Sequence, residues 1–288
     1  MYKVVTKRYL NDAKTICLFE IEAPLIARHA QAGQFVVFRL DEQGERVPVS
    51  VAGYDREKGT VTVMVQAAGK TTKMLHTVEQ GDVICDIVGP LGKATEMEGL
   101  KKVCVVGGGV GCAIAYPIAK EMHARGIDVT FIAGFRSADI VILKEELKAA
   151  SDKLIIATDD GSYGEKGFTT VFLKNEIEAN IAEGKPQFYR VIAIGADIMM
   201  KFLADVTRPY NISTIISLDP IMVDGTGMCG CCRVIVDGET KFACADGPDF
   251  DAHKVDFDSL IKRAAFYKDE QDEAAQHICR ITGGKRNG

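Results

Sequence analysis

The first ninety or so residues alternate between apolar and polar positions in short runs. Residues 15–21, 34–40 and 60–65 carry β-branched or aromatic side chains in this alternation, and turn-forming residues separate the runs. A period of two residues with frequent turns is typical of antiparallel strands. We therefore expect a small antiparallel β-barrel that ends near residues 89–92.

The pattern changes after about residue 100. Residues 103–106, 128–136, 153–158 and 189–195 form nearly continuous apolar runs, and stretches with helical spacing separate them. Strands buried on both faces and alternating with helices indicate a doubly wound parallel sheet. Near the C-terminus, residues 260–267 have helical spacing, and Asp256 or Asp258 is suited to cap that helix.

These patterns predict an α/β plus β protein with three domains. We expect a β-barrel over 1–97, a Rossmann-like α/β domain over 98–220, and a small domain with the C-terminal helix over 221–288. The fold class follows from the change of period along the chain.

Composition excludes several classes of protein. The 288 residues are 47% hydrophobic and carry a net charge of −5, with no long basic run and no apolar stretch long enough for a membrane span. These features argue against a nucleic-acid or membrane protein. The start of the sequence has no secretory apolar region, and the nine cysteines are clustered, so we expect a reducing, cytoplasmic location.

A glycine-punctuated segment gathers the most distinctive side chains. Asp224, Cys229, Cys232 and Cys244 have the spacing D-x4-C-x2-C-x11-C. Plant-type 2Fe–2S sites have C-x4-C-x2-C and a distant cysteine, so aspartate stands here in the first ligand position. A carboxylate is a harder donor than a thiolate but can complete a tetrahedral iron site. We predict a 2Fe–2S cluster held by these four residues.

Two other interpretations of this segment stay open. Zinc could take three thiolates and one more ligand, although Cys244 has no nearby cysteine to form a second knuckle. A buried cysteine patch without metal is the other, although a glycine-rich loop offers little core to bury it. Cys231 is a spare thiol that could replace Asp224 as a ligand. Outside this set, we expect Cys104 and Cys112 to be core thiols, Cys279 to be a thiol without function, and His253 to make a structural hydrogen bond.

A second glycine-rich turn follows the apolar run at 103–106. Its glycines can bring backbone N–H groups to a pyrophosphate at the start of the next helix. The predicted nucleotide-binding residues of this turn are Gly107, Gly108, Gly109, Val110 and Gly111. Because ligands bind at the carboxyl ends of parallel strands, we add residues at or near the other strand ends. These are Arg136, Asp159, Asp160, Gly161, Gly195 and Met199.

Part of the barrel resembles the ferredoxin-reductase family. That family has a G-Q-F strand, an R-x-P-x-S flavin motif and a glycine–threonine phosphate loop, and this sequence has their counterparts in that order. The resemblance implies FAD binding by Arg46, Pro48, Val49, Ser50, Gly69, Lys70, Thr71 and Thr72. Arginine suits a pyrophosphate because its guanidinium forms a bidentate fork, and Ser50 could orient flavin N5. A second glycine of the family's phosphate loop is missing here, where Lys70 or Thr71 stands. We expect the helix after this loop to run from Thr72 to Val78.

The run D-G-T-G-M-C-G-C-C-R-V at residues 224–234 resembles a narrower family, the small subunits of NADH-dependent reduced ferredoxin:NADP oxidoreductase. The resemblance implies NAD(H) as the nucleotide, although no acid follows the second α/β strand to bind a ribose hydroxyl and Arg136 could suggest a 2′-phosphate. It also implies a larger partner with FAD and 4Fe–4S clusters, where ferredoxin and NADP(H) react and electron bifurcation occurs.

Three cofactors in this order suggest an oxidoreductase that transfers electrons. A nicotinamide exchanges a hydride, a 2Fe–2S cluster exchanges one electron, and a flavin can exchange with both. We therefore expect FAD to pass electrons between NAD(H) and the cluster. Two alternatives are kept, the electron-transfer subunit of dihydroorotate dehydrogenase B, which normally has four cysteine ligands, and a zinc-stabilised, non-enzymatic binding module.

Overall fold

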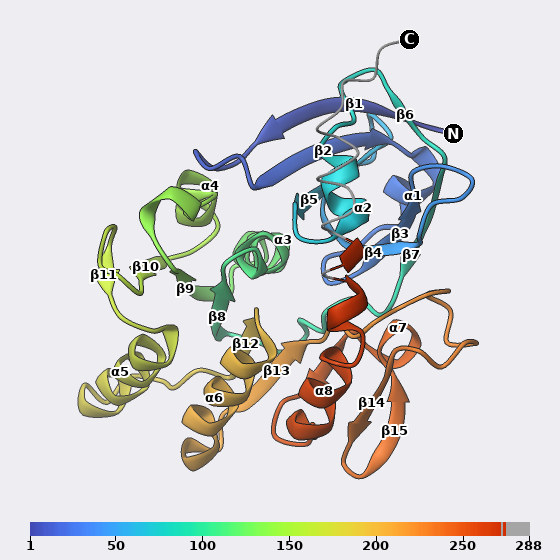
Figure 1. The fold of residues 1–288 in the computed structure, drawn as a ribbon. Coiled ribbons are helices and arrows are strands. Elements are labelled where there is room, and N and C mark those ends of the chain that lie inside the picture. Colours follow the sequence, from blue (N-terminus) through green and yellow to red (C-terminus); the bar gives the residue numbers. More distant parts are fainter. Residues whose placement is uncertain (272, 275–288) are drawn as a thin grey trace.

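The N-terminal part of the computed structural model is the expected antiparallel barrel (Figure 1). The structure describes residues 1–271 and 273–274. The seven strands pair in the order β6-β1-β2-β5-β4-β3-β7. Their bounds are β1 (Tyr2–Tyr9), β2 (Ile16–Glu22), β3 (Phe35–Arg39), β4 (Val47–Asp55), β5 (Thr60–Gln66), β6 (Val83–Ile84) and β7 (Asp86–Leu91), with helices α1 (Pro24–His29) and α2 (Lys70–Leu75) between them.

The middle of the chain forms the predicted parallel sheet with the order β11-β10-β9-β8-β12-β13-β16. Its central strands are buried on both faces, which explains their apolar sequences. The strands are β8 (Lys102–Gly108), β9 (Asp128–Phe135), β10 (Lys153–Thr158), β11 (Glu165–Lys166), β12 (Arg190–Ile194) and β13 (Ser213–Ser217). The helices are α3 (Gly111–Ala124), η1 (Ala138–Ile140), α4 (Lys144–Ala149), α5 (Thr169–Ala182), α6 (Asp197–Thr207) and η2 (Arg208–Tyr210).

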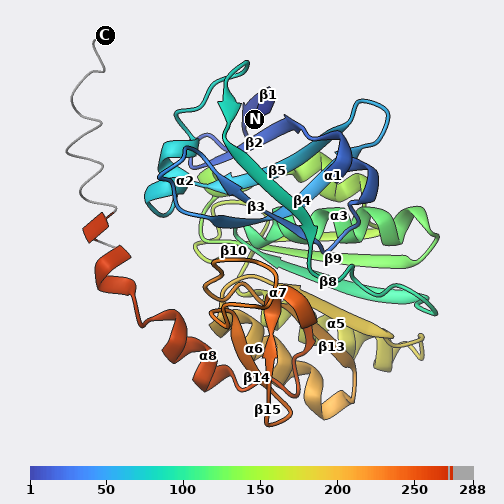
Figure 2. The same ribbon diagram turned by 90° about the vertical axis from the view of Figure 1, so that its right-hand side faces the viewer.

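The C-terminal segment combines a hairpin with short helices, which are β14 (Arg233–Val236), β15 (Glu239–Phe242), α7 (Ala243–Asp246), β16 (Asp249–Asp251) and α8 (Phe257–Ala264). Strand β16 pairs antiparallel with β13 and thereby extends the sheet of the middle segment. The predicted domain boundaries stay a prediction, but the second and third segments share one sheet. Figure 2 shows this segment below the barrel, and its helix α8 packs beside α6.

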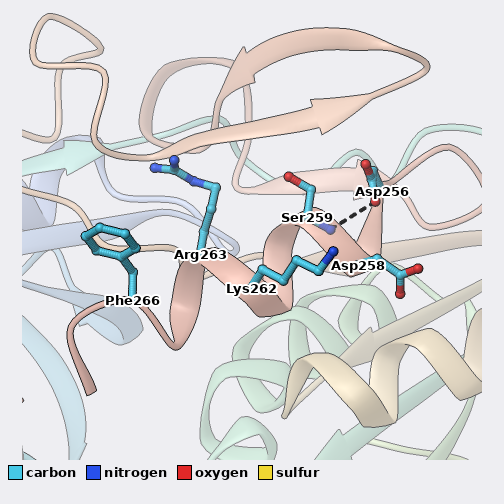
Figure 3. A pocket seen from close by; sticks show the side chains of 6 residues that line it. All are labelled: Asp256, Asp258, Ser259, Lys262, Arg263 and Phe266. Atoms are coloured by element: carbon cyan, nitrogen blue, oxygen red, sulfur yellow. Dashed lines mark hydrogen bonds between the residues drawn. The ribbon is translucent and has the colours of Figure 1, made fainter. Parts of the chain in front are cut away.

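Helix α8 begins where the sequence predicted. The Asp256 side chain caps it by accepting a hydrogen bond from the Ser259 backbone N–H at 3.0 Å, as Figure 3 shows. Arg263 and Phe266 line a pocket beside this helix, and the half-buried Arg263 donates a hydrogen bond to the Cys231 carbonyl at 3.1 Å. Helix α8 packs on α6 and β14, so it contacts both the middle segment and the C-terminal hairpin.

Several expectations about single residues of the sequence can be compared with this fold. Cys104 and Cys112 are buried thiols of the core, and burial raises the pKa of each. His253 makes the expected structural contact, with its Nε2 2.9 Å from Thr207 Oγ1. Cys279 lies outside the described residues. Within the described part of the chain, no helix combines the length and apolarity that a bilayer crossing requires.

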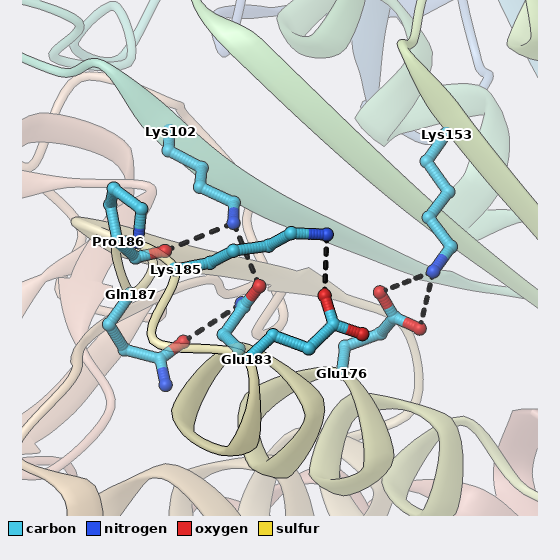
Figure 4. A network of polar contacts seen from close by, with 8 residues as sticks. Lys102, Lys153, Glu176, Glu183, Lys185, Pro186 and Gln187 are labelled. Carbon is cyan, nitrogen blue, oxygen red and sulfur yellow. Dashed lines mark hydrogen bonds and ion pairs between the residues drawn. The ribbon is translucent and has the colours of Figure 1, made fainter.

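A polar network fastens α5 to the amino ends of the strands (Figure 4). The Lys102 ammonium, at the start of β8, donates to Asn180 Oδ1 at 2.9 Å and to the Pro186 carbonyl at 3.0 Å. Lys153, at the start of β10, pairs with Glu176 at 2.7 Å. Because these contacts lie at the end opposite the strands' carboxyl ends, we assign them a structural role.

A buried carboxyl joins the interdomain linker to the sheet edge. Asp249 Oδ2, on β16, accepts a hydrogen bond from Thr95 Oγ1 at 2.6 Å. Asp249 Oδ1 is buried and has no hydrogen-bond partner in the part of the chain that the structure describes. Burial therefore raises the pKa of Asp249 to about 6.

This raised pKa predicts a pH dependence of stability. Because the folded protein binds the Asp249 proton more tightly, the stabilisation is complete below the usual pKa near 3.8 and is lost as the pH rises through about 6. Asp249→Asn should remove this fall, which amounts to at most about 3 kcal/mol at 1.36 kcal/mol per pKa unit. Urea unfolding at several pH values measures it. Asp251→Asn, on the same strand, is the control and should keep the wild-type slope.

Candidate functional site

The predicted cluster ligands lie on and beside a loop that turns its backbone N–H groups inward. Asp224 Oδ1 accepts a hydrogen bond from the Thr226 N–H at 2.8 Å, and Asp224 Oδ2 accepts one from the Cys229 N–H at 2.8 Å. The Thr226 N–H in particular holds the pKa of the Asp224 carboxyl below its usual range. The loop therefore stabilises an anion at Asp224, as a negatively charged ligand requires.

The four predicted ligands fall into two pairs. Cys232 and Cys244 are buried, and their sulfur atoms are 3.1 Å apart. Burial raises the pKa of Cys244 to about 12, so a thiolate there needs a nearby cation. Cys229 is exposed beside Asp224, and backbone N–H groups, that of Cys231 first, lower its pKa.

This donor set can be divided between the two irons of a cluster. A 2Fe–2S cluster takes four protein ligands, two on each iron, which matches one Asp224–Cys229 pair and one Cys232–Cys244 pair. Among the described residues, no three or more His, Cys, Asp and Glu side chains gather as a single metal ion requires. Cys231 is half-buried next to Cys229, and its interaction with the Cys229 side chain raises its pKa.

The cluster loop packs directly on the barrel. Gly225, which follows the predicted ligand Asp224, faces β3 and β7 so closely that a Cβ there would lie 2.8 Å from Leu91 Cδ1 and 3.1 Å from Val37 Cγ2. On the other side of β3, Val37 pairs with Pro48 of β4. One strand therefore separates the loop from the predicted flavin motif.

Strand β4 presents that motif as a half-buried strip. Pro48, Val49 and Ser50 are all half-buried, and the strand pairs with β3 on one side and β5 on the other. Arg46 lies exposed in the loop before β4. This is the arrangement expected if a flat, apolar ring covers the strand and its phosphates extend toward Arg46.

In the predicted phosphate loop, side chains of the protein already make hydrogen bonds to one another and to the backbone. Helix α2 begins at Lys70, two residues before the expected start. The Thr72 hydroxyl accepts hydrogen bonds from the Ala68 and Gly69 N–H groups, at 3.1 and 3.0 Å, so it caps the turn. The Thr71 hydroxyl donates to the Glu45 carboxylate. This contact, which the sequence did not suggest, brings Arg46 and Lys70 to the same corner of the barrel.

The residues at that corner of the barrel have the properties that binding of a flavin phosphate requires. A Cβ on Gly69 would meet no atom within 4 Å, so the backbone is open to a ligand. The Glu45 carboxylate shows that the Thr71 hydroxyl can bind an anion. Arg46 and Lys70 are both exposed cations. The residues present therefore fit a pyrophosphate, provided that Glu45 yields its contact with Thr71.

The glycine-rich turn of the nucleotide segment connects β8 to the start of α3. The Gly109 N–H donates to the Gly134 carbonyl at 2.8 Å, which holds the turn over the end of β9. Gly108 approaches Gly195, at the end of β12, and a Cβ on either glycine would collide with the Met199 side chain. Met199 thus covers a contact between two strand ends that only glycines allow. The predicted residues Gly108, Gly109, Gly195 and Met199 therefore meet at the carboxyl end of the sheet.

The end of β10 carries two acids, Asp159 and Asp160, whereas Arg136 follows β9. The Asp159 and Asp160 N–H groups donate to the carbonyls of Phe135 and Arg136, at 3.0 and 3.4 Å. The Ser162 hydroxyl donates to Asp160 Oδ1 at 2.6 Å, and this bond holds the Asp160 pKa below its usual range. The β10 end therefore places a fixed carboxylate beside the Arg136 turn.

Helix α3 begins at the carboxyl end of β8 and packs on the barrel. It packs on β4, and Ala52 of β4 shares an apolar core with Cys112 and Ala113 of α3. Strand β4 therefore has α3 on one side and, across β3, the loop that contains Asp224 on the other.

The comparisons with known proteins agree with this geometry. The iron–sulfur cluster binding domain of dihydroorotate dehydrogenase B matches residues 219–256. The dihydroorotate dehydrogenase B (NAD(+)) electron transfer subunit homolog of Thermotoga maritima is 43% identical over 271 residues, which cover 94% of each chain. An uncharacterized protein of Clostridium beijerinckii is 48% identical and covers 96% of this chain and 94% of its own.

A solved structure of NADH-dependent reduced ferredoxin-NADP oxidoreductase, described for flavin-based electron bifurcation, contains a similar chain. It is 40% identical, has a TM-score of 0.87, and the match covers 96% of this chain and 97% of that one. Phthalate dioxygenase reductase, at 17% identity and a TM-score of 0.60, supports the fold alone. The chain therefore belongs to the ferredoxin-reductase-like family that includes the electron-transfer subunit of dihydroorotate dehydrogenase B and this subunit of NADH-dependent reduced ferredoxin-NADP oxidoreductase.

Proposed function

We propose that this chain is an electron-transfer subunit that exchanges electrons between NAD(H) and a 2Fe–2S cluster through FAD. The observation that carries the proposal is the position of β4, between α3 of the nucleotide segment and, across β3, the loop that holds Asp224. When bound, the nicotinamide supplies hydride chemistry, the cluster supplies one-electron chemistry, and the flavin supplies both.

The side chains of this chain bind and orient rather than transfer protons. Arg46 and Lys70 offer positive charge to the flavin phosphates, and Ser50 offers a hydroxyl on the half-buried strip. The turn at 107–111 offers backbone N–H groups at the start of α3 to the nicotinamide dinucleotide. Asp224, Cys229, Cys232 and Cys244 hold the cluster.

An anaerobic titration with NADH tests the proposal. The purified chain should take up about three electrons, two in the flavin and one in the cluster, and so consume about 1.5 NADH per chain. The visible absorption of both groups should bleach. Uptake of about one NADH with an unchanged cluster spectrum would contradict the relay, and a protein with bound zinc and no NADH response would support the alternative binding module.

The relatives also suggest a partner subunit. Several relatives are named electron transfer subunits, and the structure at 40% identity is a ferredoxin-NADP oxidoreductase. We propose a larger flavoprotein partner with its own FAD and 4Fe–4S clusters, where ferredoxin and NADP(H) react in electron bifurcation, and a cytoplasmic location for the complex. Aspartate at position 224 favours this partner, because dihydroorotate dehydrogenase B normally has cysteine there.

Affinity purification of this chain from its native cells tests the partner. Recovery of a flavoprotein that contains 4Fe–4S clusters is the expected result. The dihydroorotate dehydrogenase B domain match at residues 219–256 keeps that enzyme as a second candidate. Recovery of only a subunit that oxidises dihydroorotate would favour it and reject the proposed partner.

Asp160 should favour NADH over NADPH. Its carboxylate is fixed beside the Arg136 turn and would repel a 2′-phosphate, so Asp160→Asn should raise the ratio of NADPH to NADH efficiency about tenfold. Flavin reduction rates with the two nucleotides measure this ratio. Asp152→Asn, at the opposite end of β10, serves as the control, and an unchanged ratio in the Asp160 variant would reject the role of this carboxylate.

A further inference from the structure

Gly225 occupies the most restricted position of the cluster loop. It is buried and has a φ of +76°, a region that residues with a Cβ rarely adopt. A Cβ built on it would lie 2.8 Å from Leu91 Cδ1, 3.1 Å from Val37 Cγ2 and 3.9 Å from Phe35 Cε2. Both the backbone conformation and the barrel surface therefore require glycine here.

The barrel side of this contact cannot easily retreat. Leu91 of β7 and Val37 of β3 are held in a hydrogen-bonded sheet, in which Phe35 pairs with both Leu91 and Ser50. Val37 and Phe35 are buried, with exposed fractions of 5% and 4%. The end of the half-buried Leu91 side chain can turn aside, but Val37 is β-branched and buried, so an added side chain at position 225 would still press the loop outward. The displaced backbone would carry the neighbouring Asp224 with it.

We propose that Gly225 is a positioning residue that fixes the distance between the cluster and the flavin strip on β4. The inference rests on the proposed function, since it concerns electron transfer between these two groups. The rate of electron transfer falls steeply as donor and acceptor move apart, so a small outward shift of the loop slows this step. Helix α3 of the nucleotide segment packs on β4, whereas Gly225 faces β3 and β7, so we expect the exchange of hydride with the nicotinamide not to depend on this contact.

The test compares Gly225→Ala with Gly230→Ala in the holoprotein. Gly230 is in the same loop, also has a positive φ of +71°, and a Cβ there would meet only Phe242 Cε1, at an ordinary 3.7 Å. The two variants therefore share the backbone strain, and only Gly225→Ala presses on the barrel. Iron and flavin content and the low-temperature spin resonance spectrum of the reduced cluster show whether each variant holds its cofactors. Rapid mixing with NADH then separates flavin reduction from cluster reduction.

We expect Gly225→Ala to reduce its flavin at the wild-type rate and its cluster about tenfold or more slowly. Gly230→Ala should keep both rates. Adding Leu91→Ala to Gly225→Ala removes the closest barrel atom and should restore much of the lost rate. Equal cluster reduction in Gly225→Ala and wild type would overturn the proposal, as would equal slowing in Gly230→Ala.

A second variant covers the outcome in which Gly225→Ala loses its iron. Val37→Leu adds bulk to the same contact from the barrel side and leaves the loop sequence unchanged. It should slow cluster reduction while flavin reduction and iron content stay at the wild-type level, and a wild-type rate would reject the positioning role. If the wild-type chain itself lacks flavin or iron, the proposed function fails instead, and the two failures are distinguishable.

Discussion

Replacing Cys232 with alanine should remove nearly all iron from the protein. Cys232 is 1% exposed, and its sulfur lies 3.1 Å from that of Cys244, so its loss leaves one iron of the proposed cluster with a single protein ligand. We expect about two iron atoms per chain in the wild type and a small fraction of that in the variant. Iron analysis and the visible spectrum of anaerobically purified protein measure this loss.

Cys231→Ala is the matched control, because Cys231 adjoins Cys232 in the chain but belongs to neither ligand pair. It should keep its iron. Loss of iron in Cys231→Ala and retention in Cys232→Ala would show that the ligand set has been assigned wrongly. Equal retention in both variants would argue against a cluster in this loop. The folded state of each variant is checked by its flavin content, since the barrel does not depend on these cysteines.

Replacing Arg46 with alanine should deplete the protein of FAD. The guanidinium is exposed beside the corner where Thr71 already holds an anion, the Glu45 carboxylate. A hydrogen bond between charged groups contributes about 1.5 to 3 kcal/mol, so its loss weakens binding about tenfold to a hundredfold. Flavin content after gel filtration and the dissociation constant for added FAD measure the effect.

Lys58→Ala provides the control for that prediction. Lys58 is another exposed barrel cation, and it pairs with Asp55 in the turn between β4 and β5. This variant should retain FAD as the wild type does. Full flavin occupancy in Arg46→Ala would remove Arg46 from the site, and equal depletion in both variants would indicate a general effect of charge or barrel stability.

The periodicity of the sequence predicted the fold well for strands with a continuous apolar run. The apolar runs at 128–136 and 153–158 became β9 and β10 within one residue, because strands buried on both faces leave few polar positions. Strand β16 was not expected, since a three-residue strand is too short for a period and depends on its pairing with β13. The start of α2 was also misplaced, because the Thr72 side chain caps the turn that precedes it.

The candidate site was predictable as a set of residues but not as a set of contacts. The spacing indicated that Asp224 and three cysteines form one set of ligands, since the ligands of one cluster recur at short intervals along the chain. The contact of Gly225 with Leu91 joins residues far apart in the chain, and no local pattern encodes it. The same is true of the Thr71 hydroxyl with the Glu45 carboxylate and of the Ala138 N–H with the Ser162 hydroxyl.

The central claim is that one chain holds a flavin and a two-iron cluster with three sulfur ligands and one oxygen ligand. Iron, sulfide, flavin and zinc analysis of protein isolated without oxygen, with a low-temperature spin resonance spectrum after reduction, tests it most directly. We predict about two iron, two sulfide and one flavin per chain, and the spectrum of a single reduced 2Fe–2S cluster. A colourless protein that contains zinc, or neither metal nor flavin, would contradict the claim.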